Sequence, residues 1–240
     1  MRGCVGYLGF RSALDVLLGG LDGLRAPGGA CGVALVADGG LAVAKRAGTA
    51  DDLRALLGAR PLPAAGTGIG HLGAPDVRPL TDAAAYPQSD DAGRVAVAQD
   101  GALDDGDALR AELAGRGHRL VSGTDAEAVA HLFAEAFSSC GDPGEAMRQV
   151  CRAARGTFVL LAVHADAPDT LVAARRGLPL TVGLGGGEAF AASDGAAFGG
   201  EGAHEVLPLD GAGEDVVVLR RGADEVGCEI TDAEGGVVRA

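Results

Sequence analysis

The sequence has no tryptophan, and aromatic residues make up only 3% of its 240 positions. Large rings therefore cannot fill much of the interior. The core must be built from alanine, valine and leucine, packed closely against many of the 41 glycines. Hydrophobic residues still account for 48% of the chain, so there is enough apolar material for one large domain or two small ones.

Positive charge is also scarce. Lys45 is the only lysine, and 20 lysine and arginine residues stand against 33 aspartate and glutamate residues, which gives a net charge of −13 at pH 7. Nucleic-acid binding depends on cationic groups that neutralise phosphates, so no nucleic-acid partner is expected. An anionic membrane surface is an equally poor partner. The acidity is expected to keep the protein in solution.

No pattern typical of a metal site, a disulfide framework or a membrane span is present. The cysteines form no C-x-x-C pair and lie far apart at positions 4, 31, 140, 151 and 228. Such usage is typical of a reducing cytoplasm. Charges at Arg11 and Asp15 interrupt the first apolar stretch, and no uncharged apolar run reaches about 18 residues, so neither a signal peptide nor a membrane span is expected.

The sequence shows no sign of a bound cofactor either. The histidines at 118, 131, 164 and 204 are dispersed and predict no metal site. The glycine run 183–187 is followed by no helical pattern, so it is interpreted as a tight turn between strands and not as a phosphate-binding loop.

Hydrophobic periodicity predicts an alternation of strands and helices, followed by a long run of strands. Thr124 and Glu127 form the clearest helix start, a capping box, and Ser12 is a second predicted cap. Asp100-Gly101 is interpreted as a turn, and residues 72–93 as a long loop. Antiparallel strands in two groups, with helices between them, indicate an α+β layered sandwich. Predicted helices cover 12–24, 50–58, 105–116, 121–137 and 144–155, and predicted strands cover 3–9, 31–37, 41–47, 67–71, 94–100, 157–165, 169–176, 178–185, 188–193, 204–209, 214–221 and 228–230.

The first strand carries Cys4 almost at the start of the sequence. A cysteine at a chain terminus can be a complete catalytic device, because its thiol is the nucleophile and its free α-amine is the base. Met1 is normally removed only before small residues, and Arg2 follows it here, so Cys4 is expected to lack a free amine. We therefore interpret Cys4 as a small buried hydrophobe, with a reactive role as the alternative.

Several stretches carry a family resemblance, in order along the chain: LAVAKRAG, GTGIGH, LRAELAGRGH, VSGTDAEAVAHL and residues 168–194. The sequence resembles the glutaminase domain of glutamine–fructose-6-phosphate aminotransferase, a class II glutamine amidotransferase with the N-terminal-nucleophile hydrolase fold. That resemblance implies a four-layer αββα sandwich. It extends over essentially all of residues 1–240 and stops where the sugar-phosphate isomerase domains of the family would begin, so a single domain is expected.

Most of the family's catalytic residues have no counterpart in this sequence. Arg2 stands at the position of the nucleophilic cysteine, and Gly73 at the position of the arginine that binds the glutamine carboxylate. Asp100 replaces the asparagine of the oxyanion hole, whose other member, Gly101, is retained. Asp125 matches the carboxylate that binds the glutamine amine. The resemblance thus implies that ordinary glutamine hydrolysis has been lost.

Several candidate ligand-binding residues remain. If the fold is kept, Asp76, Asp100 and Asp125 are expected to converge in the former glutamine pocket, where they would bind an amine or a metal ion. Each candidate also has a structural interpretation: Asp125 as a first-turn helix acid, Gly101 as a turn glycine, and His71 as a hydrogen-bonding residue at a strand end.

Three hypotheses on function stay open. The leading one is a stand-alone, catalytically degenerate glutaminase-domain homologue that acts by binding or regulation, with a small amine ligand or with a protein partner such as an aminotransferase or another biosynthetic enzyme. The second is an enzyme of a different reaction that uses the acidic pocket or Cys4. The third is a true amidotransferase whose N-terminus is processed to expose Cys4.

Overall fold

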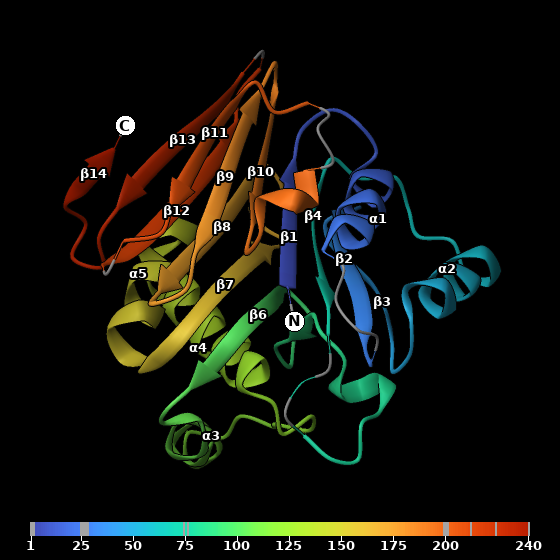
Figure 1. Ribbon diagram of the computed structural model, residues 1–240. Helices are drawn as coiled ribbons and strands as arrows, with labels where there is room; N and C mark the ends of the chain where they lie inside the picture. The colour runs from blue at the N-terminus through green and yellow to red at the C-terminus, as the bar shows by residue number, and fades with distance from the viewer. Residues whose placement is uncertain are drawn as a thin grey trace.

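Two antiparallel β-sheets form the centre of the molecule, and helices cover both of their outer faces (Figure 1). The computed structural model describes residues 3–24, 29–73, 75, 77–198, 202–211, 213–223 and 225–239. Within these ranges each sheet has seven strands. The expected α+β, four-layer αββα sandwich is confirmed.

The first sheet contains the N-terminal strand at its centre. Its strand order is β11-β9-β10-β1-β4-β2-β3. Strand β1 pairs antiparallel with β4 on one side and with β10 on the other, so both of its edges are hydrogen-bonded. The strands are β1 (Gly3–Leu8), β2 (Cys31–Ala37), β3 (Gly40–Arg46), β4 (Thr67–Leu72), β9 (Leu180–Gly185), β10 (Glu188–Ala192) and β11 (Glu205–Leu209).

The second sheet is built mostly from the C-terminal half of the chain. Its strand order is β14-β13-β12-β8-β7-β6-β5. The strands are β5 (Gln88–Ser89), β6 (Val95–Leu103), β7 (Gly156–His164), β8 (Thr170–Arg176), β12 (Glu214–Arg221), β13 (Val226–Thr231) and β14 (Val237–Arg239).

The helices fall into two layers. Helices α4 and α5 pack on the outer face of the second sheet, with α3 beside α4, and helix α1 packs on the first sheet against β1 and β4. The α-helices are α1 (Ala13–Gly23), α2 (Ala50–Ala59), α3 (Gly106–Gly115), α4 (Asp125–Cys140) and α5 (Pro143–Ala153), and the 3-10 helices are η1 (Asp82–Ala84) and η2 (Gly195–Phe198). Among the described residues, none of these helices combines the length and apolarity that a bilayer crossing requires.

Three apolar layers separate the four structural layers. One lies between α1 and the first sheet, one between the two sheets, and one between the second sheet and helices α3 to α5. Strand alternation assigns the side chains of β1 to two of them: Cys4 and Leu8 enter the layer between the sheets, whereas Val5 and Tyr7 face α1. Both faces of the N-terminal strand are therefore buried.

Side-chain caps explain where the helices begin. Ser12 accepts a hydrogen bond from the backbone N–H of Asp15, and Thr124 accepts one from Glu127, as predicted. Glu127 departs from the expected capping box, because its carboxylate accepts hydrogen bonds from the backbone N–H groups of Val121 and Ser122. A complete capping box that was not predicted joins Thr49 and Asp52 at the start of α2.

The predicted turn at Asp100-Gly101 is wrong. Strand β6 continues through both residues to Leu103, and Gly101 pairs with Phe158 of β7. Gly101 has a φ of +84°, and a Cβ atom there would lie 2.1 Å from the carbonyl oxygen of Thr157. Glycine is therefore required inside the strand because another backbone approaches it closely. In the sequence, such a glycine looks the same as a glycine that marks a turn.

Four short elements were not predicted. The expected loop 72–93 contains η1 and the two-residue strand β5, and two further elements, η2 and β14, lie in the C-terminal part of the chain. Each has only two to four residues. Such segments are too short to show a hydrophobic period.

The buried layer between the sheets is expected to dominate stability. Val217 of β12 is fully buried in that layer, whereas Val206 of the edge strand β11 is 52% exposed. Val217→Ala should lower the free energy of unfolding by about 2 kcal/mol, because it removes two buried carbon atoms and leaves a cavity. The matched Val206→Ala should change it by less than about 0.5 kcal/mol. Equal values from urea denaturation would contradict the layer assignment.

Candidate functional site

A small pocket lies where the end of β6 meets the start of α4. Its volume is about 190 Å³. The backbone N–H of Leu103, the last residue of β6, donates to Asp125 Oδ2 over 3.0 Å, and this contact joins the two elements. The pocket thus brings together two candidate residues that the sequence places 24 positions apart, Gly101 and Asp125. The lining residues are Val77, Tyr86, Gly101, Ala102, Arg110, Gly123, Thr124 and Asp125.

Asp125 is held by an arginine of the neighbouring helix. Arg110 Nη1 donates to Asp125 Oδ1 over 2.6 Å, and Arg110 Nη2 donates to Asp107 over 2.6 Å. The Arg110 and Asp125 side chains are 22% and 21% exposed, so the pair is partly desolvated. Gly106 leaves room for it, since a Cβ atom there would lie 2.2 Å from Asp125 Oδ1. The pocket therefore presents a carboxylate and a guanidinium side by side.

Cys4 lies outside the pocket, within the layer between the sheets. Its side chain is fully buried, and its backbone N–H donates to Ser193 Oγ over 3.0 Å. Burial, together with the negative charge of Asp100, raises the pKa of the Cys4 thiol to about 12. The thiol is therefore protonated at neutral pH and a poor nucleophile.

Asp100 faces the sheet layer rather than the pocket. Ala96 and Ala98 of the same strand enter the layer between the sheets, and alternation turns Asp100 toward the same side. One of its carboxylate oxygens, Oδ1, accepts a hydrogen bond from the backbone N–H of Gly101 over 2.9 Å. Asp100 and Asp125 consequently lie on opposite faces of the strand end.

His71 stands behind the pocket wall. It is fully buried on β4, directly opposite Cys4 of β1, and its ring packs edge-on against Tyr86 with centroids 4.8 Å apart. Tyr86 in turn lines the pocket. The third predicted carboxylate, Asp76, lies outside the described residues. The expected convergence of Asp100 with Asp125 in one pocket is therefore not found, and only the place of Asp76 stays a prediction.

Sequence reasoning missed Arg110, which lines the pocket, and Lys45, which supports the segment beside it. Arg110 gave no local signal, because its partner Asp125 lies 15 positions away on another helix. Lys45 did have a signal in the sequence, because it is the single lysine of the chain. Its Nζ donates to the carbonyl oxygen of Ala83 over 3.0 Å and to Gln88 Oε1 over 3.1 Å, which ties the segment around Tyr86 to β3. Burial lowers the pKa of Lys45 to about 8.

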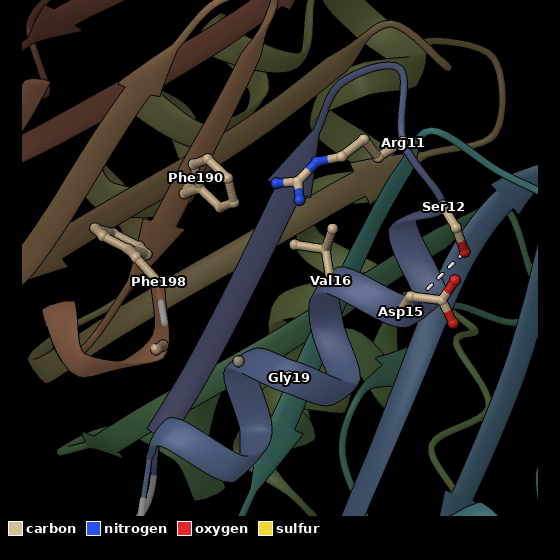
Figure 2. Close-up of a pocket in the computed structure, with 9 residues that line it drawn as sticks. Arg11, Ser12, Asp15, Val16, Gly19, Phe190 and Phe198 are labelled. Carbon is tan, nitrogen blue, oxygen red and sulfur yellow. Dashed lines mark hydrogen bonds between the residues drawn. The ribbon is translucent and has the colours of Figure 1, made fainter. Parts of the chain in front are cut away.

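A second, larger hollow of about 410 Å³ lies on the far face of the first sheet, beside α1 (Figure 2). Phe190 and Phe198 form one side, and Arg11 lies near its upper end. The Arg11 guanidinium is bound to Glu188 through two hydrogen bonds, of 2.7 and 3.0 Å. None of the residues predicted for the site lines this hollow, so we assign the candidate site to the pocket at Asp125.

Thiol labelling tests the burial of Cys4. With iodoacetamide at pH 8, the folded protein should be alkylated at the partly exposed Cys140 and Cys228, because burial keeps Cys4, Cys31 and Cys151 inaccessible and raises their pKa values. All five thiols should react in urea. Peptide mass mapping reads out each position. Rapid alkylation of Cys4 in the folded protein would contradict its assignment to the sheet layer.

Comparison with known proteins agrees with the fold and with the resemblance. The chain is 54% identical over 222 residues to glutamine–fructose-6-phosphate aminotransferase of Streptomyces coelicolor, covering 92% of this chain and 36% of that protein. It is 41% identical over 245 residues to the Thermus thermophilus protein of the same name, covering 100% of this chain and 38% of the relative. The chain thus spans little more than a third of the length of these relatives.

Solved structures of related fold include the glutamine phosphoribosylpyrophosphate amidotransferase of B. subtilis in complex with ADP and GMP. It has a TM-score of 0.75 and 19% sequence identity, and the alignment covers 99% of this chain and 50% of that one. A structure described as the allosteric regulatory enzyme of purine biosynthesis aligns with a TM-score of 0.78 at 19% identity, over the same shares of the two chains. A family model described as a glutamine amidotransferase domain matches residues 78–198, just over half of the chain. This chain belongs to the class II glutamine amidotransferase domain family and is related to the glutaminase domain of glutamine–fructose-6-phosphate aminotransferase.

Proposed function

We propose that this domain has lost glutamine hydrolysis and acts as a ligand-binding or regulatory homologue of the glutaminase domain. The observation that carries the proposal is the hydrogen bond from the Gly101 N–H to Asp100 Oδ1, at 2.9 Å. In the family this glycine and an asparagine form the oxyanion hole. Here the N–H of Gly101 is occupied by the carboxylate of Asp100, the residue that stands at the position of the asparagine.

The consequence for catalysis is severe. Loss of one oxyanion donor costs about 10²–10³ in rate. A carboxylate at the same place adds repulsion toward a developing oxyanion. The nucleophile position holds Arg2 and the position of the substrate arginine holds Gly73, so a charge-assisted contact of roughly 2–5 kcal/mol is also missing. The buried, protonated thiol of Cys4 supplies no replacement nucleophile.

The pocket keeps the chemistry for recognising a small amine. Asp125, the counterpart of the family's amine-binding carboxylate, lines it together with Arg110. A zwitterionic amino acid would place its ammonium group on Asp125 and its carboxylate on Arg110, in exchange for the ion pair between them. Ligand occupancy would then be sensed at the junction of β6 and α4. We propose that ligand binding in the pocket then controls the interaction with a protein partner, an aminotransferase or another biosynthetic enzyme.

Glutamate release from L-glutamine tests the loss of activity. The purified protein should release no more glutamate than its Cys4→Ala variant, because neither the thiol nor the oxyanion donors are available. Release that disappears in Cys4→Ala would overturn the proposal and identify Cys4 as the nucleophile. Intact-mass measurement of the same sample shows whether Met1 is present, and so separates a processed N-terminus from an unprocessed one.

Ligand binding is tested by calorimetry with L-glutamine, L-glutamate and simple amines. Asp125→Asn should weaken binding of the responding ligand by about tenfold or more, since it removes a partly desolvated charge partner. Asp107→Asn is the matched control: this carboxylate also pairs with Arg110 but is fully exposed, so affinity should be nearly unchanged. Equal losses in both variants, or no response to any ligand of the panel, would contradict a binding role for the pocket.

A further inference from the structure

Two histidines that are 13 positions apart in the sequence meet in the structure. His118 follows helix α3, and His131 lies within α4. Their Nδ1 atoms are 2.9 Å apart, and their rings are nearly perpendicular, at 89°. His131 is almost fully buried, with 2% of its side chain exposed. Two imidazoles that direct the same kind of nitrogen at each other share either a proton or a cation.

A carboxylate completes the group. Asp91 follows strand β5, and its Oδ2 lies 3.9 Å from His131 Nδ1. Among the described residues, the ligand atoms of Asp91, His118 and His131 all lie within 4.8 Å of one another. The Asp91 side chain is 48% exposed, so it can approach the two histidines without disturbing the core, and solvent reaches the group from its side.

A second carboxylate orients His118 from behind. His118 Nε2 is 2.6 Å from Glu135 Oε1, and Glu135 also pairs with Arg116. The arginine favours the ionised carboxylate, which only accepts hydrogen bonds, so Nε2 carries the proton of a neutral His118. Its Nδ1 then presents a lone pair to His131. A carboxylate behind a histidine is the usual outer partner of a metal-ligating imidazole.

We propose that Asp91, His118 and His131 form a binding site for a divalent transition-metal ion of the zinc class. Two imidazole nitrogens and one carboxylate oxygen are a donor set for zinc, cobalt or nickel, whereas magnesium and calcium require oxygen ligands. Three protein ligands leave a fourth position for water. The site is separate from the pocket at Asp125, and the proposal does not depend on the proposed function.

The histidine pair needs only a small adjustment, whereas Asp91, with its Oδ2 3.9 Å from His131 Nδ1, must move closer. A metal–nitrogen distance of about 2.0–2.1 Å in a tetrahedral site places the two nitrogens about 3.3 Å apart, so the histidine pair opens by about 0.4 Å. Without metal, His131 Nδ1–H donates to His118 Nδ1. Metal binding removes that proton from His131 Nδ1, and the other ring nitrogen of His131 can take it.

A metal ion bound at this site would link the edge of the second sheet to the helices that cover it. Asp91 lies two residues after the edge strand β5, whereas His131 belongs to α4, and His118 to the segment between α3 and α4. Metal binding is therefore expected to stabilise the folded state as well as to bind stoichiometrically.

Cobalt(II) titration of the chelator-treated protein is the test, followed by displacement with zinc. We expect one equivalent bound per chain, with the visible absorption of nitrogen and oxygen ligation, displacement by zinc but not by magnesium, and a higher thermal midpoint. A thiolate charge-transfer band would overturn the proposal, because it would assign the metal to cysteines. Absence of binding at millimolar cobalt or zinc would overturn it equally.

Variants locate the ion. His118→Ala and Asp91→Asn should each weaken cobalt binding by about tenfold or more, and Glu135→Gln by about 10–100-fold through His118. These positions are partly exposed, so their variants are expected to fold even if the variant at the buried position, His131→Ala, does not. His204→Ala is the matched control and should bind as the parent does. Binding that survives both ligand variants unchanged would contradict the site.

Discussion

Close contact between the two sheets is the constraint on which the rest of this structure depends. A chain with 3% aromatic residues cannot fill a wide gap, so its sheets must approach closely. Gly6 in the middle of β1 shows how closely: a Cβ atom there would lie 2.7 Å from Leu171 of the opposite sheet. Within the first sheet, antiparallel pairing holds β1 between β4 and β10 and places Cys4 opposite His71.

The end of β6 combines a strict packing requirement with a polar pocket. Gly101 is kept because its positive φ and its contact with β7 permit no side chain, whatever the pocket does. The N–H of Gly101 donates to its neighbour Asp100, and the proposed loss of glutamine hydrolysis rests on this contact. The carboxylate of Asp125 survives together with Arg110 as a partly desolvated pair. Packing between the strands therefore fixes this backbone independently of glutamine hydrolysis, which we propose the domain has lost.

Local sequence signals predicted the elements whose cause is local. The Ser12 and Thr124 caps and the long amphipathic helices follow from residues within one or two turns, and they were found correctly. The strand through Gly101 was misinterpreted, because glycine is required there by Thr157 of a strand more than 50 positions later. No local pattern distinguishes a glycine that turns the chain from one that admits a neighbouring backbone.

The sequence by itself determined the fold class and the family resemblance, because each is carried by residue identity at fixed positions. Only the tertiary structure decided which charges meet. Arg110 of α3 pairs with Asp125 of α4. His118, His131 and Asp91 come together from three separate segments. The physical reason is range: caps and periodicity act over a few residues, whereas ion pairs and ligand clusters form between atoms that only the packed layers bring within a few ångströms.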